Sequence, residues 1–270
     1  MVKNTKHDIL SAPLPKWAKL PINRCNIPSE TLGSLGFQAH PRPLHLDGVH
    51  SLHKDLFTKL DVYPDPEDRQ QQFIDYMNVH FAANDPARKQ TKRHKASYQS
   101  LLRGWFFDSD SREAAVLKGW VESRFGLSPN FHRGRLNDKS SALYANFMQM
   151  RADGLYATYA LEAQMDLLYS YCQYELSKLR IPITLYRGVN RLEEFTILHK
   201  QDKRAVVLFN NLNSFSSDKE TAGAFGDIII KVRVPKEKIL CFPALLDQKF
   251  TSENEFMVIG GLYDVTLSYY

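Results

Sequence analysis

No run of apolar residues in this chain approaches the ~18 needed to cross a bilayer, and the first residues lack the apolar stretch of a secretory signal peptide. Cysteine is also scarce. Three occur, an odd number without C-x-x-C spacing, which argues against a disulfide framework or a structural zinc site. At 270 residues, of which 43% are hydrophobic, the chain can bury a sizeable core. We therefore expect a cytoplasmic protein with no membrane segment.

Two further absences concern nucleotides. A glycine-rich loop of the G-x-G-x-x-G type is missing, which argues against a dehydrogenase. The formal net charge is +5, and the densest basic stretch covers residues 88–95, but aromatic residues are not interleaved with it as base stacking would require. We interpret this stretch first as a solvated linker, second as a docking segment for an acidic protein, and third as a nucleic-acid site.

The two halves of the chain differ in their pattern of apolar residues. Apolar residues at helical spacing predict helices over residues 48–60, 68–81, 97–107, 111–125 and 140–179. Beyond residue 181, segments rich in Ile, Val, Phe and Tyr predict strands, with Gly260-Gly261 as an interruption, over residues 206–209, 227–234, 239–242 and 255–270. Because no obvious linker separates the halves, we predict one α+β domain over residues 1–270. In it, a mainly helical part (1–180) packs on a strand-rich part (181–270).

A pair of acids precedes the last predicted strand. Glu253 and Glu255 flank Asn254, and the alternation of side chains along a strand projects both carboxylates to the same side. Such a pair suits a reaction in which one acid stabilises a developing sugar cation and the other engages a positively charged acceptor. On their own, two acids on the solvated face of an antiparallel sheet are ordinary.

An arginine closes an otherwise apolar strand face. Pro182 suits a strand start or edge, after which Ile183, Leu185 and Arg187 share one face. The planar guanidinium suits a bidentate contact with phosphate oxygens, so a pyrophosphate ligand would explain this position. The alternative is an edge arginine capped by a carboxylate.

Serines follow the strand over residues 206–209. Ser217 and Glu220 have the spacing of a capping box, which predicts a short helix from Ser217 to near Gly226. Ser214 and Ser216 then lie at the strand end, where hydroxyl groups can hold a ribose or fix a carboxylate. Turn and cap formation explains Ser217 but not Ser214.

In this order, the three segments resemble the arginine-specific ADP-ribosyltransferases, which carry an Arg, Ser-x-Ser, Glu-x-Glu signature. The matching residues are 185–188, then 214–216 with Ala222 and Phe225-Gly226, then 253–255. Phe215 departs from the pattern, because many members have a small polar residue there, so the key serine can be Ser214 or Ser216. Segments 23–28, 32–38 and 40–49 further resemble the dinitrogenase reductase ADP-ribosyltransferases of nitrogen-fixing bacteria.

This resemblance implies an ADP-ribosyltransferase-like split β-sheet core. It also implies transfer of ADP-ribose from NAD, a consumed substrate, to one arginine of dinitrogenase reductase, the nitrogenase iron protein, which switches nitrogen fixation off. A PII-type signalling protein is an expected partner. Rival functions are modification of another protein or nucleic-acid acceptor, plain NAD hydrolysis, and non-catalytic binding.

Roles for individual residues follow from the same resemblance. Glu255 would stabilise the cationic ribose, Glu253 would bind the acceptor arginine, and Ser214 would position Glu255. Arg187 would hold phosphate or ribose oxygens. Further candidates for NAD binding are Gly188, Ser216, Asn23 and Arg24, although the last two can equally be loop anchors. The loop over residues 247–252, with Phe250, is expected to touch the acceptor.

Four histidines, His40, His45, His50 and His53, lie close together with Asp47, a density that can indicate metal ligation. No pair has the i, i+4 spacing with an intervening acid that makes a helical metal site persuasive. Packing and hydrogen bonding are the favoured roles, and we expect no metal.

Overall fold

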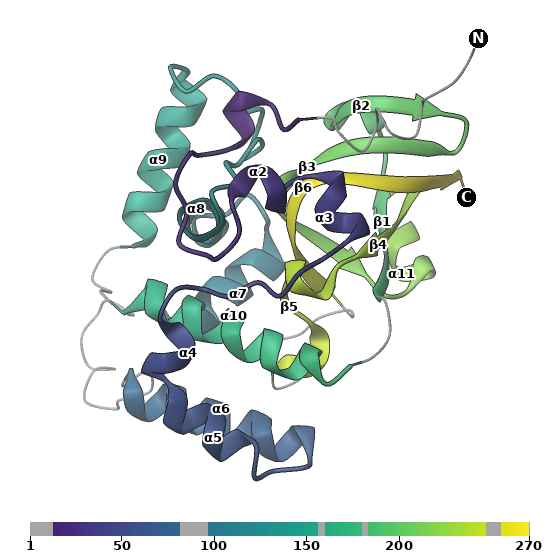
Figure 1. Cartoon of the computed structure of the whole chain (residues 1–270). Helices are drawn as coiled ribbons and strands as arrows, with labels where there is room; N and C mark the ends of the chain where they lie inside the picture. The colour runs from purple at the N-terminus through teal and green to yellow at the C-terminus, as the bar shows by residue number, and fades with distance from the viewer. Residues whose placement is uncertain (1–12, 82–96, 156–159, 180–182, 247–254, 270) are drawn as a thin grey trace.

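The computed structural model describes residues 13–81, 97–155, 160–179, 183–246 and 255–269 (Figure 1). Its first part is helical, with η1 (Lys16–Ala18), α2 (Ser29–Leu32), α3 (Leu35–Ala39), α4 (Val49–Leu52), α5 (Lys54–Leu60), α6 (Pro66–His80), α7 (Tyr98–Phe107), α8 (Arg112–Phe125), α9 (Ala142–Gly154) and α10 (Leu161–Ser177). The rest comprises β1 (Ile183–Val189), η3 (Leu192–Glu194), β2 (Thr196–Gln201), β3 (Arg204–Ser216), α11 (Lys219–Gly223), β4 (Ile228–Val234), η4 (Lys236–Lys238), β5 (Ile239–Cys241), η5 (Pro243–Leu245) and β6 (Glu255–Tyr269).

The strands form one antiparallel sheet in the order β2-β3-β1-β4-β6-β5, in which β3 also pairs with β6. Tyr186 of β1 pairs with Ser216 at the end of β3, whereas β3 pairs with β6 from Arg204 to Ser216. The strand β3 therefore parts from β1 and follows β6, so the sheet is split between β1 and β3. The predicted α+β fold class is confirmed.

Helices cover the sheet and share its core. In Figure 1, α7, α8 and α10 lie beside the sheet, α9 lies beyond α8, and α5 and α6 lie beyond α10. The helix α8 packs on β3, α10 on β5, α3 on β6 and α11 on β1. Buried apolar side chains from both parts form one continuous cluster, from Leu14 to Leu267. We therefore propose that the two parts form a single folding unit. None of the described helices is long and apolar enough to cross a membrane.

A bulge in β3 ties the sheet to the helical part. Asn210 and Asn211 together face Gly260 of β6, where a Cβ atom would lie 1.6 Å from the carbonyl oxygen of Asn210. Asn211 Nδ2 donates to the carbonyl oxygens of Lys118 and Leu127 at 2.7 and 3.0 Å. These bonds fix the position of β3 relative to α8, and therefore the position of Ser214 and Ser216, which follow in the same strand.

Two predicted helices are each divided in the structure. Residues 48–60 form α4 and α5, which meet at His53, where φ of −109° and ψ of 29° leave the helical range. The buried His53 ring bonds to the hydroxyl of Tyr76 at 2.9 Å, so a tertiary contact accompanies the break. Residues 140–179 form α9, which ends at Gly154, and α10, which begins at Leu161. Glycine is a poor helix former, which suits an end at this position.

The predictions for the strand-rich part need four corrections. The sequence pattern does not indicate β2, a largely polar edge strand. The strand β3 is longer than residues 206–209, because its polar residues are buried and hydrogen-bonded to the helical part. The helix α11 is capped by Asp218, not Ser217, since the Asp218 carboxylate accepts from Thr221 N at 2.8 Å. Finally, Gly260 and Gly261 lie inside β6 without ending it.

Candidate active site

Glu255, Ser214 and Arg187 border one cavity of ≈ 460 Å³ between α7, α11 and the split edge of the sheet. Glu255 is the first residue of β6 and pairs with Ser216, so it lies diagonally across from Ser214 on the same face. Ser214 Oγ donates a hydrogen bond to Glu255 Oε1. Three of the four predicted catalytic residues are thus brought together, while Glu253 lies outside the described residues.

Trp105 completes this arrangement from the helical part. Its indole Nε1 donates to Ser214 Oγ at 3.0 Å and to Glu255 Oε1 at 3.1 Å. The residue lies on the buried face of α7 and is 2% exposed. The sequence predicts the helix but not this contact, because helical periodicity does not say which strand the buried face meets. Trp105 is therefore a site residue that sequence reasoning missed.

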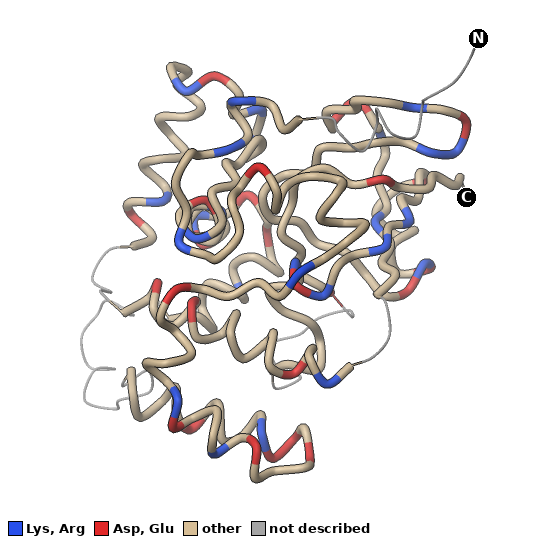
Figure 2. The backbone as a smooth tube through the Cα atoms, in the orientation of Figure 1, with Lys and Arg blue, Asp and Glu red and all other residues tan. Residues whose placement is uncertain are grey.

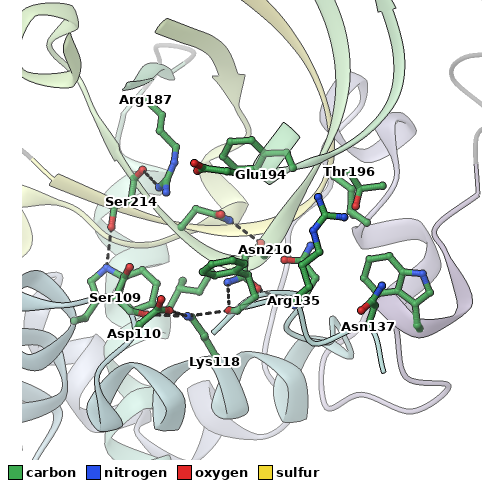
Figure 3. A pocket seen from close by; sticks show the side chains of 18 residues that line it. Ser109, Asp110, Lys118, Arg135, Asn137, Arg187, Glu194, Thr196, Asn210 and Ser214 are labelled. Carbon is green, nitrogen blue, oxygen red and sulfur yellow. Dashed lines mark hydrogen bonds and ion pairs between the residues drawn. The ribbon is translucent and has the colours of Figure 1, made fainter. Parts of the chain in front are cut away.

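Arg187 lies between two cavities. It borders the cavity of ≈ 460 Å³ and a second one of ≈ 140 Å³, which Ser214 and Trp105 also line. Its Nη1 donates to the carbonyl oxygen of Ser214 at 2.7 Å, and its buried Nε has no hydrogen-bond partner among the described residues. Burial lowers the pKa of Arg187, opposed by the carboxylates of Glu255 and Glu194. In Figure 3, the Glu194 carboxylate is turned toward the Arg187 guanidinium.

A buried lysine, Lys118, lines the smaller cavity (Figure 3). Lys118 of α8 is 1% exposed, and its Nζ donates to Asp110 Oδ1 and to the carbonyl oxygens of Ser109 and Phe131 at 2.8–3.0 Å. Its Nζ also lies 3.2 Å from Nδ1 of His132. One ammonium group thus joins the turn after α7 to the loop around Phe131, and both border the cavity. No sequence motif indicates this network.

The charges in this network depend on one another. Burial lowers the pKa of Lys118, although Asp110 opposes the shift. The pKa of Asp110 is lowered despite its burial, because Lys118 favours the ionised carboxylate. Burial and the neighbouring ammonium lower the pKa of His132 to about 4, so the ring is neutral near pH 7. The network therefore contains a close Lys118–Asp110 ion pair and a neutral imidazole, which shares the three N–H groups of Lys118 with the other three acceptors.

Gly188 and Ser216 also line the larger cavity, but local structure already explains both. A Cβ atom at Gly188 would lie 1.9 Å from the carbonyl oxygen of Ala222, so glycine here allows α11 to pack on β1. Ser216 Oγ accepts from the backbone N–H of Asp218 at 3.0 Å and holds the turn into α11. Because Ser214 contacts Glu255, the geometry favours Ser214 as the serine that positions the acid.

Asn23 and Arg24 do not line either cavity. Asn23 Nδ2 donates to the carbonyl oxygen of Ile27 at 2.7 Å, and its Cβ faces Gly126 at the C-terminal end of α8. Both cavities are lined by Ser109, which lies just before the N-terminal end of α8. The helix spans about 20 Å, so Asn23 and the cavities lie toward opposite ends of it. These contacts agree with loop anchoring.

Packing contacts account for two of the four clustered histidines, while His40 and His45 are exposed. His53 is 3% exposed and contacts His80 and Tyr76, and both burial and His80 lower its pKa. His50 stacks on Phe57 with ring centroids 4.5 Å apart. Within the described ranges, no group of three or more His, Cys, Asp or Glu side chains is arranged to hold a metal ion.

Comparison with known proteins identifies the family. Residues 22–267 match the family described as dinitrogenase reductase ADP-ribosyltransferase. The chain is 38% identical over 261 residues to the NAD(+)–dinitrogen-reductase ADP-D-ribosyltransferase of Rhodospirillum rubrum, an alignment that covers 92% of this chain and 94% of the relative. No solved structure matches the chain significantly. The resemblance expected from the signature residues is confirmed, and this chain belongs to the dinitrogenase reductase ADP-ribosyltransferase family.

Proposed function

We propose that this protein transfers ADP-ribose from NAD to a specific arginine of dinitrogenase reductase and thereby inactivates it. The observation that carries the proposal is the contact of Ser214 and Trp105 with Glu255 in a cavity that Arg187 also borders. The family match and the name of the relative support both NAD as the substrate and dinitrogenase reductase as the acceptor.

NAD is a dinucleotide, and the site offers two adjoining cavities for it. Because Arg187 borders both, its planar guanidinium can hold the diphosphate that joins the two nucleosides. Its buried Nε lacks a hydrogen-bond partner among the described residues, a situation that typically costs about 1–3 kcal/mol, and a phosphate oxygen would remove this cost. The nicotinamide ribose then lies in the larger cavity beside Glu255.

The first chemical step breaks the bond between ribose C1′ and the nicotinamide nitrogen. Both electrons leave with nicotinamide, which departs as a neutral molecule, so the step needs little acid catalysis. The ribose becomes oxocarbenium-like, and Glu255 stabilises it through its negative charge and a hydrogen bond from the 2′-hydroxyl. Ser214 and Trp105 fix Glu255 Oε1, which holds the carboxylate in place before the charge develops.

The second step forms the bond from C1′ to a nitrogen of the acceptor arginine. A protonated guanidinium is a poor nucleophile, so one acid must orient it and accept a proton as the bond forms. We assign this role to Glu253, because the sequence predicts that its side chain projects to the same side as Glu255. Since Glu253 lies outside the described residues, this assignment rests on the sequence.

Two substitutions test the division of roles. Glu255→Gln should lower both NAD hydrolysis and arginine modification by about a hundredfold or more, because the cation loses its counter-charge. Glu253→Gln should end arginine modification while slow NAD hydrolysis remains. The measurement is incubation with labelled NAD and purified dinitrogenase reductase, followed by mass spectrometry of the modified residue.

Glu220→Gln is a matched control, since Glu220 is an exposed acid on α11 that does not line the larger cavity. Modification of arginine by the Glu253→Gln variant at the wild-type rate would contradict the proposed roles. Equal release of nicotinamide with and without the acceptor would instead indicate a plain NAD glycohydrolase. The PII-type partner and the cytoplasmic location stay predictions, because they rest on the resemblance and on the sequence.

A further inference from the structure

The rim of the larger cavity carries an exposed aromatic ring that the chemistry does not use. Phe107 is the last residue of α7, is 93% exposed and borders the cavity together with Asp108. Residues two positions apart on a helix point in nearly opposite directions. Because Trp105 is directed inward to Glu255, the ring of Phe107 is directed outward at the cavity mouth.

Phe107 is one of several exposed phenylalanines that border the cavities. Single exposed apolar side chains are common on protein surfaces, so exposure alone indicates little. Among the residues that the structure describes, however, the exposed phenylalanines are Phe107, Phe131 and Phe225, and each borders one of the two cavities. Phe225 is 62% exposed and lies next to α11, which packs on β1 and lines the larger cavity. Exposed apolar side chains of other kinds occur elsewhere on the surface, but the exposed phenylalanine rings lie at the two cavities.

The cavity rim beside Phe107 carries the negative charge of Asp108. Asp108 is exposed, and its Oδ1 accepts from the backbone N–H of Asp110 at 2.8 Å, which holds its carboxylate at the rim. Elsewhere both signs are mixed: Figure 2 shows acidic and basic residues on the helical and on the strand-rich parts. The formal net charge of +5 belongs to the chain as a whole and does not describe the charge at this rim. An aromatic ring beside a carboxylate suits a partner that presents a cation next to an apolar side chain.

We propose that Phe107 and Asp108 form a docking contact for the acceptor protein, a folded surface that presents its target arginine beside an apolar side chain. The inference rests on the proposed function. A guanidinium lies no farther than one side-chain length from its own backbone, so a guanidinium that reaches Glu255 brings the surrounding acceptor surface onto the rim. Phe107 packs against the apolar neighbour of the arginine, and Asp108 favours its positive charge. NAD lies deeper, between walls such as Trp105, which is 2% exposed.

Phe107→Ala tests the contact with the full-length protein, NAD and purified dinitrogenase reductase. We expect the KM for the acceptor to rise about tenfold or more, as for an aromatic contact at an interface centre. The dissociation constant for NAD, measured by titration calorimetry, should stay within about twofold of the wild type. Phe107→Leu, which keeps an apolar side chain, should recover most of the loss. Val79→Ala is the control, because Val79 is 84% exposed on α6 and does not line the larger cavity.

Asp108→Asn keeps an oxygen that can accept from Asp110 but removes the charge. Its KM for the acceptor should rise severalfold at low ionic strength and approach the wild-type value at high salt. An unchanged acceptor KM in Phe107→Ala overturns the docking contact, as does a loss of NAD affinity without a change in acceptor KM, which would make Phe107 part of the dinucleotide site. Absence of transfer by the wild-type protein would instead refute the proposed function itself.

Discussion

Replacing Trp105 by phenylalanine removes one N–H group from the centre of the site while keeping an aromatic ring in the core. The lost group donates to Ser214 Oγ at 3.0 Å and to Glu255 Oε1 at 3.1 Å. A hydrogen bond to a charged group typically contributes about 1.5–3 kcal/mol. If this free energy orients Glu255 for the transition state, its loss lowers kcat by about tenfold to a hundredfold. The KM for NAD should change little, since the ring that lines the cavity is retained.

The matched control is Trp120→Phe. Trp120 of α8 is also buried, and its Nε1 donates to a carboxylate, Asp166 Oδ1, at 2.7 Å, but it does not line either cavity. Both substitutions should lower the free energy of unfolding, by about 1–3 kcal/mol, because each loses packing and the hydrogen bonding of one indole N–H group. Only Trp105→Phe should lower kcat. Urea denaturation separates the two effects, and the assay is incorporation of labelled ADP-ribose at saturating substrates.

Combining Trp105→Phe with Ser214→Ala sharpens the test. Both side chains hold the same oxygen of Glu255, so the double variant should lose less activity than the product of the two single losses predicts. A kcat for Trp105→Phe equal to that of the wild type would refute the argument. So would a selective rise in the KM for NAD, because Trp105 would then form a wall of the substrate site without positioning Glu255.

Two further predictions concern stability. Folded His132 stays neutral down to about pH 4, whereas in the unfolded chain it gains its proton near pH 6.5, so acidification between these values favours unfolding by up to about 1.4 kcal/mol per pH unit. His132→Asn keeps an oxygen that can accept from Lys118, and its free energy of unfolding should fall less steeply between pH 6.5 and 4. If urea denaturation gives parallel pH profiles for the variant and the wild type, protonation of His132 is not the cause. Gly188→Ala should cost about 1–3 kcal/mol or more, because its Cβ would meet the Ala222 carbonyl oxygen at 1.9 Å. Gly36→Ala, whose Cβ meets nothing closer than 3.4 Å, should be neutral or mildly stabilising, and equal stability of the two variants would refute the packing role of Gly188.

Local pattern predicted the elements better than their ends. The helices over residues 97–107 and 111–125 agree closely with α7 and α8, because each has a serine cap and a strong apolar face. The division of 48–60 at His53 depends on a contact with Tyr76, which is 23 residues away. The strand β3 continues through polar residues that the sequence pattern does not assign to a strand. It can do so because the buried Asn211 is hydrogen-bonded to the helical part. In these two places, a distant partner overrode the local preference.

The sequence by itself determined the family, the order of the Arg, Ser-x-Ser and Glu-x-Glu segments, and the α+β class, because these depend on residue types and on short-range periodicity. Only the tertiary structure decided that Trp105 contacts Ser214 and Glu255, that Lys118 joins two loops beneath the smaller cavity, and that Ser216 serves a turn. The physical reason is that a hydrogen bond or a buried charge is set by what faces it across the fold. Trp105 and Glu255 are 150 residues apart in the chain, and no local pattern records that they meet.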